Sequence, residues 1–328
     1  MRNFKKQNLN LVRQSERFYQ DSYSTDDESF NSLINYTNLH YPRMLIEDIH
    51  LSIMPYRIAK NNLSVSISPH NKDVENLIGN AVGKRDYGRN LYDSVAEFIR
   101  KCATEIMIHG KAVYEISYLY NSENKPEEFI LFKVFPISII EENGKLIQKL
   151  PAKVATEKDL NGNTIALSPE NFVWFNLPDY MKESYLPMMD SLSRLSTETS
   201  MPDFAFGSIT SKAPKVPFNV EKFTHNKTMA VVQACKKIGW RGRNILAPKF
   251  TTEYYDLHLF FLFEFFKAEL RNSILVSLNE AIARAGSKLG FEAVITIKGI
   301  PTLSDIEDSN KMLAEGNCEF LELINPYL

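Results

Sequence analysis

The chain has 328 residues, 44% of them hydrophobic, and a formal net charge of −2 at pH 7. This length is enough for a sizeable core in two or three subdomains, and the 21 phenylalanines and 15 tyrosines exclude a disordered polar chain. No run of 18 apolar residues occurs, which argues against a membrane span.

Residues 1–30 are polar, begin basic and end acidic, and predict a flexible N-terminal arm. Its first seven residues lack the apolar stretch of a secretory signal. The spacing of Cys102, Cys235 and Cys318 fits neither a disulfide framework nor a metal site. These features favour a protein made in a reducing cytoplasm.

Residues 31–180 predict an α+β domain. Apolar spacing indicates a helix around Pro42–Met54 and a second over Asn71–Val82, which ends at Gly83. A helical period from Leu91 to His109 then changes at once to strand alternation from Lys111 to Tyr120. Gly110 suits the position after the helix, where a positive φ is favoured.

Further strand signals follow, and together they predict an antiparallel meander. They cover Phe129–Phe135, Ser138–Glu141 and Leu146–Leu150. The dipeptide Asn143-Gly144 predicts a type I′ hairpin between the last two, because both of its residues tolerate positive φ. A short buried strand is expected at Phe172–Phe175.

Residues 181–250 change to a helical, basic character. A helix is predicted from Pro187 to Thr199, with the proline in its first turn, and another from Glu221 to Ile238, which Gly239 ends. Between 210 and 250 there are nine Lys or Arg and one Glu, a local charge of +8. This concentration of positive charge suggests a basic surface for an anionic partner. Pairing of the basic residues with acidic neighbours elsewhere in the chain explains the same charge equally well.

The basic side chains near Trp240 could neutralise phosphates without reading sequence, while the indole could stack on a base or simply anchor the turn. The candidate nucleic-acid-binding residues are Lys212, Lys215, Lys236, Lys237, Trp240, Arg241, Arg243 and Lys249.

Residues 251–328 predict one long helix, about 50 Å from Thr252 to Ala285, followed by a strand at Ala293–Ile297 and a second helix. A capping box is expected at Ser304 and Glu307. The first half of the long helix is apolar nearly all round, so it must be buried on several sides, either in its own core or against neighbouring copies. The candidate interface residues are Leu259, Phe263, Phe266, Leu270 and Ile274.

No arrangement of residues indicates catalysis. The six histidines are scattered, none forms a metal-binding motif, and neither a glycine-rich phosphate loop nor a nucleophile elbow occurs. The sequence therefore predicts a protein that is not an enzyme and has no cofactor or metal. A hydrolase or transferase with an unrecognised site is the least favoured reading.

Three stretches carry a resemblance to a known family: HGKAVYEISYLY (109–120), FKVFPISII (132–140) and NFVWFNLP (171–178). They resemble the wing region of tailed-phage portal proteins of the HK97-like type. Gly110, Lys111, Ala112, Tyr114 and Glu115 match the first motif of that family, and Phe135-Pro136 matches the second. The long helix, strand and final helix also agree in order, although portal proteins usually continue beyond this point.

The resemblance implies a structural subunit that forms a homo-oligomeric ring, with a wing-like meander, a stem-like long helix and a basic stem or clip segment. It implies a sequence-independent conduit for double-stranded DNA at the capsid vertex of a virion, made in a bacterial host. The expected partners are the terminase motor, the capsid and head-tail adaptor proteins, with no membrane. The alternative is a nucleic-acid-binding or interaction protein of phage-derived origin that forms no ring.

Overall fold

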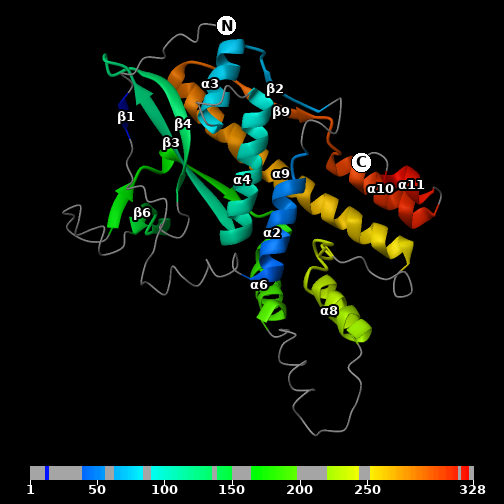
Figure 1. The fold of residues 1–328 in the computed structure, drawn as a ribbon. Coiled ribbons are helices and arrows are strands. Elements are labelled where there is room, and N and C mark those ends of the chain that lie inside the picture. Colours follow the sequence, from blue (N-terminus) through cyan, green and yellow to red (C-terminus); the bar gives the residue numbers. More distant parts are fainter. Residues whose placement is uncertain are drawn as a thin grey trace, which may run out of the picture. The chain divides into compact units, whose positions relative to one another are not determined.

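The computed structural model describes residues 12–14, 39–55, 63–83, 90–134, 139–149, 164–197, 220–243, 252–316 and 319–324. These residues form helices and antiparallel sheets, so the predicted α+β class is confirmed (Figure 1). Two compact units share the chain. Unit 1 comprises residues 1–32, 54–176 and 272–299, and unit 2 comprises residues 33–53, 177–271 and 300–328. Each unit is thus assembled from three separate stretches of sequence.

The main sheet of unit 1 is built around β3 (Lys111–Tyr120). β4 (Pro126–Val134) pairs with β3 on one edge, and β8 (Phe172–Asn176) pairs with residues 111–115 on the other. The short strand β1 (Val12–Gln14) pairs with the remaining end of β3 at residues 118–120. Eight of the ten β3 residues are buried, so both faces of the strand are covered. The apolar alternation of the sequence predicted burial of one face only.

The predicted change from helix to strand at residues 109–111 is confirmed. α4 (Leu91–His109) begins at Asn90, whose side chain accepts a hydrogen bond from the Asp93 amide. It ends at Gly110, where φ is 76° and the amide bonds to the Ile106 carbonyl at 2.7 Å. The helix packs on the sheet through the rings of Phe98, Tyr114 and Phe175, whose centroids lie 5.0–5.6 Å apart.

His109, at the end of α4, predicts a pH-dependent stability. Burial lowers the pKa of its imidazole, although the Glu105 carboxylate 3.6 Å away acts in the opposite direction. The folded state therefore binds this proton less readily than the unfolded state, so stability falls as the pH drops below about 6.5. We expect urea unfolding at pH 7 and pH 5 to show a smaller loss of stability for His109→Gln than for the unchanged chain. His40→Gln removes an exposed imidazole and is the control; an equal pH response in His109→Gln would contradict the prediction.

The predicted hairpin at Asn143-Gly144 is also confirmed. Both residues have positive φ, 54° and 72°, as a type I′ turn requires. The hairpin joins β5 (Ile139–Glu142) to β6 (Lys145–Lys149), and β7 (Thr164–Leu167) pairs with the other edge of β6. The motif residues Phe135-Pro136 lie outside the described residues.

The strand predicted at Ala293–Ile297 is β9 (Val294–Lys298), and its partner is β2 (Ser64–Ser68), which the sequence patterns did not indicate. α3 (Lys72–Val82) follows β2 and is capped by Asn71. Asn279 of the long helix fixes β9 by two hydrogen bonds with the backbone of Ile295, at 2.8 and 3.1 Å.

Unit 2 is helical. It contains α2 (His40–Ser52), the 3-10 turn η6 (Asp179–Met181), α6 (Lys182–Thr197), α8 (Val220–Ala234), α10 (Leu303–Glu315) and α11 (Phe320–Ile324). α6 starts five residues before Pro187, so the proline lies inside the helix and not in its first turn as predicted. The capping box of α10 is made by Thr302 and Asp305, which corrects the predicted Ser304 and Glu307. The true pair lies two residues earlier because α10 starts at Leu303.

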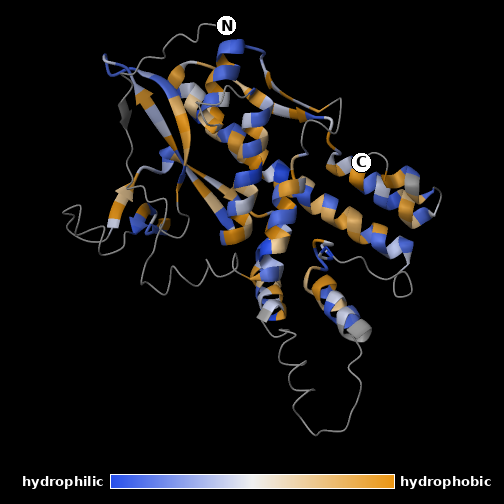
Figure 2. Ribbon diagram, viewed as in Figure 1, coloured by the Kyte–Doolittle hydropathy of each residue, from blue (hydrophilic) through white to orange (hydrophobic). Residues whose placement is uncertain are grey.

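The long helix α9 (Glu253–Leu289) contributes its residues up to Arg271 to unit 2. No side chain between Tyr255 and Arg271 is exposed. One side packs with α10 and α11 in a cluster that includes Leu257, Phe261 and Ile306, and another packs with α8 through Leu259 and Val232. Hydrophobic residues accordingly do not gather on a single stripe of α9 (Figure 2). Among the described residues, no helix is both long and apolar enough to cross a membrane.

Candidate functional site

The turn that follows α8, residues 235–243, brings together several of the predicted site residues within unit 2. Gly239 has φ of 69°, and its amide bonds to the Cys235 carbonyl at 2.9 Å. A Cβ placed on Gly239 would lie 2.2 Å from the carbonyl oxygen of Leu259. Only glycine allows the turn to approach the backbone of α9 this closely.

Two carboxylates near the end of α2 hold the turn. The Trp240 indole donates to Asp48 Oδ2 at 3.0 Å, and Arg243 Nε donates to Asp48 Oδ1 at 2.7 Å. Arg243 also donates to Glu47 at 3.1 Å. Hydrogen bonds from Arg43 and then Arg243 lower the pKa of Glu47, and the bond to Asp48 raises the pKa of Arg243.

The environment of Trp240 corrects its assignment as a nucleic-acid-binding residue. Only 3% of Trp240 is exposed, and its ring nitrogen is bonded to Asp48. A base cannot stack on an indole that is covered by its own chain. Trp240 therefore anchors the turn, which was the other reading of the sequence.

The basic candidates divide into two groups. Arg243 is paired with Glu47 and Asp48, and Arg241 lies 3.2 Å from Asp256. The Arg241 contact is an ion pair without hydrogen-bond alignment, since the same Asp256 oxygen has no hydrogen-bond partner. Both arginines thus follow the alternative in which basic residues pair with acidic neighbours.

Lys236 and Lys237 are exposed, and no carboxylate of the described residues lies within ion-pair distance of either. These two lysines remain available to an anionic partner. Lys212, Lys215 and Lys249 lie outside the described residues.

The candidate interface residues of α9 are mostly internal. Leu259, Phe266, Leu270 and Ile274 are at most 3% exposed within one chain. The sequence allowed these side chains to be buried either in their own chain or against neighbouring copies. All four are buried in their own chain, which corrects their assignment to an interface between copies. Phe263 is partly exposed and borders a pocket.

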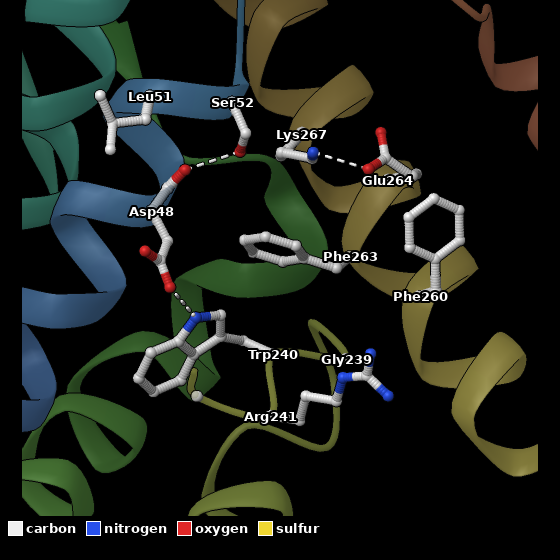
Figure 3. Close-up of a pocket in the computed structure, with 11 residues that line it drawn as sticks. Asp48, Leu51, Ser52, Gly239, Trp240, Arg241, Phe260, Phe263, Glu264 and Lys267 are labelled. Atoms are coloured by element: carbon white, nitrogen blue, oxygen red, sulfur yellow. Dashed lines mark hydrogen bonds and ion pairs between the residues drawn. The ribbon is translucent and has the colours of Figure 1, made fainter. Parts of the chain in front are cut away.

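The pocket has a volume of about 380 Å³ and lies wholly within unit 2 (Figure 3). Three elements line it: α2, the turn at residues 239–242, and the residues of α9 from Phe260 to Lys267. Leu51, Phe260 and Phe263 supply apolar surface, and Leu51 is 51% exposed. The sequence patterns did not indicate this pocket.

An ion pair lies at one wall of the pocket. Lys267 Nζ donates to Glu264 Oε1 at 2.6 Å and lies 5.1 Å from the centre of the Phe263 ring. The Lys267 side chain is 7% exposed, so a charged ammonium is held in a nearly buried position. The signal in the sequence was two opposite charges, three residues apart, within the mostly apolar first half of the long helix.

The pocket offers hydrogen-bonding groups and apolar surface. Ser52, the one lining hydroxyl, donates to the Asp48 carbonyl at 2.6 Å. The described residues contain no group of three or more His, Cys, Asp or Glu that could hold a metal ion.

Comparison with solved structures finds similar folds, including those of two chains from gene transfer agent particles. A chain from the virion of a native gene transfer agent particle has 11% identity and a TM-score of 0.45, covering 90% of this chain and 91% of that one. A chain from the neck of an empty gene transfer agent particle, solved with C6 symmetry, has 10% identity and a TM-score of 0.42, covering 92% and 94%. No protein-family model and no curated protein matches. At these identities and TM-scores the likenesses assign no function.

Proposed function

We propose that this chain is a structural subunit of a phage-like particle, and that copies of it form a ring through which double-stranded DNA passes. The observation that carries the proposal is the order of elements. The α4–β3 junction, the meander and β8 precede the helices α6 and α8, and α9, β9 and α10 follow. This is the order implied by the resemblance of residues 109–120, 132–140 and 171–178 to portal proteins.

The ring would occupy a capsid vertex of the virion, after synthesis in the cytoplasm of a bacterial host. It would dock the terminase motor, the capsid and head-tail adaptor proteins, while the ATP chemistry of packaging would belong to the motor. The subunit itself would act without catalysis.

The surface through which copies pack would not include the buried side of α9. Leu259, Phe266 and Leu270 of α9 are buried in their own chain, whereas α6 presents an exposed face that includes Leu186, 55% exposed. α6 and α8 are in contact within unit 2. In the proposed ring these helices meet a neighbour in place of the four buried side chains Leu259, Phe266, Leu270 and Ile274 of the long helix.

Sequence-independent contact with DNA would fall to Lys236 and Lys237. Ammonium groups without carboxylate partners can neutralise phosphates while leaving base edges unread. Loose contacts of this kind permit DNA to move along a channel.

The proposal is tested by mass photometry of the purified full chain at low and high salt. We expect a discrete species many times the mass of the 37.7 kDa protomer. A monomer at every concentration and salt would overturn the ring. A monomer that still binds DNA through Lys236 and Lys237 would establish the alternative, a nucleic-acid-binding protein that forms no ring.

The DNA contact has a separate test. Lys236→Ala/Lys237→Ala is expected to leave the mass unchanged and to reduce the salt dependence of DNA binding, by about 0.9 in the logarithmic slope for each phosphate that a lysine no longer neutralises. Lys298→Ala/Lys311→Ala removes two exposed lysines from elsewhere and is the matched control. Equal slopes for the two double variants would exclude Lys236 and Lys237 as DNA-binding residues.

A further inference from the structure

The ion pair between Lys267 and Glu264 can still form hydrogen bonds with a group that enters the pocket. A lysine ammonium has three donors, and among the described residues Lys267 uses one of them, on Glu264. The other two belong to a side chain that is 93% covered and lies at the pocket wall. Glu264 is 20% exposed and retains acceptor capacity. The pair therefore presents a donor and an acceptor side by side.

The charges at the pocket select a neutral guest. The lining contains two carboxylates, Asp48 and Glu264, and two cations, Arg241 and Lys267, and all four have a partner of opposite charge. A charged guest would lose hydration without an unpaired counter-charge to replace it. A neutral group that both donates and accepts a hydrogen bond meets no such cost.

The apolar walls favour a flat ring on that guest. Phe260, Phe263 and Leu51 line the pocket, and aromatic pairs are stabilised by edge or offset contacts. A phenol satisfies both requirements, because its hydroxyl can accept from Lys267 and donate to Glu264 while the ring lies against Phe263. An indole only donates, and an aliphatic hydroxyl lacks the ring.

The chain carries an exposed phenol on the same helix. Tyr254, in the first turn of α9, is 46% exposed. At about 100° per residue, Phe263 points about 180° and Lys267 about 140° away from Tyr254 around the helix axis. Of the other two α9 residues that line the pocket, Phe260 points about 120° and Glu264 about 80° away from Tyr254. Most of the pocket wall therefore faces a different side of α9 from Tyr254. A protomer with a protruding group on one side and a matching pocket on the other can join its copies head to tail, and such contacts close into rings.

We infer that Tyr254 of one copy occupies the pocket of the next copy, with its hydroxyl between Lys267 and Glu264. This inference rests on the proposed ring. It adds a specific contact between neighbours, formed by the exposed first turn of α9 in one copy and the pocket of the next.

The test measures assembly of the full chain by mass photometry over a dilution series. Tyr254→Ala is expected to raise the concentration at which the oligomer dissociates about 100-fold, and Tyr254→Phe, which keeps the aromatic ring but lacks the hydroxyl, about 10-fold. Met312→Ala is the matched control, because Met312 is also 46% exposed in unit 2, and we expect no change. An oligomer that Tyr254→Ala leaves intact would overturn this inference alone, whereas a monomeric unchanged chain would overturn the proposed function as well.

The pocket is tested separately with p-cresol as the probe. The chain has two tryptophans, so in a Trp174→Phe background the fluorescence reports on Trp240, which lines the pocket. In the Tyr254→Ala variant of that background, we expect p-cresol to change this fluorescence at least 10-fold more effectively than toluene. Lys267→Met should abolish the difference. Equal responses to the two compounds, or no response to either, would overturn the role of the hydroxyl and thus the inference.

Discussion

Gly239→Ala is expected to destabilise the protein by about 2–5 kcal/mol, the largest effect of any alanine substitution at a glycine in the described part of unit 2. An alanine must adopt the positive φ of 69° at this position, which costs about 1–2 kcal/mol. Its Cβ would also approach the Leu259 carbonyl oxygen to 2.2 Å and Leu262 Cβ to 2.6 Å, which forces the turn away from α9 and adds about 1–3 kcal/mol. Urea unfolding followed by circular dichroism measures the difference.

Gly316→Ala separates the two causes. Gly316 has nearly the same φ, 68°, and also lies in unit 2, but nothing lies within 4 Å of an added Cβ. It should therefore lose only the conformational part, about 1 kcal/mol. If the two variants were equally stable, close approach of the turn to α9 would have no energetic consequence, and the pocket wall formed by residues 239–242 would not be fixed by Gly239.

Arg271→Met is expected to destabilise the protein by about 3 kcal/mol. Arg271 is 8% exposed and donates to the carbonyls of Ile53 at 3.2 Å and Pro301 at 3.0 Å. Methionine fills the volume of the side chain stem but leaves both carbonyls without this donor, and each hydrogen bond to a charged group contributes about 1.5–3 kcal/mol. Burial lowers the pKa of Arg271 to about 10, so the guanidinium is still charged at neutral pH.

The control for Arg271→Met is Arg284→Met, measured by the same urea titration. Arg284 lies on the same helix but is exposed, and it donates one hydrogen bond, to the Phe172 carbonyl at 2.9 Å. We expect a smaller loss, about 1 kcal/mol, because the guanidinium is exposed and one hydrogen bond is lost instead of two. A loss as large as that of Arg271→Met would show that burial of the guanidinium is not the reason for its contribution.

Arg241 and Arg243, in the turn at residues 235–243, show why a basic run in a sequence is a weak sign of nucleic-acid binding. Their charges are met by Asp48, Glu47 and Asp256, which belong to α2 and α9. The count of +8 between residues 210 and 250 takes no account of such partners. Lys236 and Lys237 differ from the two arginines because the fold places no carboxylate of the described residues within ion-pair distance of them.

Local chemistry was enough to predict several elements of this protein. The helix-to-strand change at Gly110 and the hairpin at Asn143-Gly144 follow from residues that need positive φ, and this requirement is met within one turn of chain. The length of α9 follows from its apolar spacing, and the buried run at β8 from the residues between Pro169 and Pro178. In all of these cases the determining residues lie next to one another.

The remaining features depend on partners that are distant in the sequence. β2 has no strong strand pattern of its own and pairs with β9, about 230 residues later. Trp240 meets its acceptor Asp48 across 192 residues, which decides that it is an anchor and not a stacking surface. The burial of α9 by α8, α10 and α11, and the pocket between α2, the turn and α9, likewise arise when separate stretches meet. Composition and periodicity indicate that a side chain will be buried, but only the tertiary structure selects which neighbours bury it.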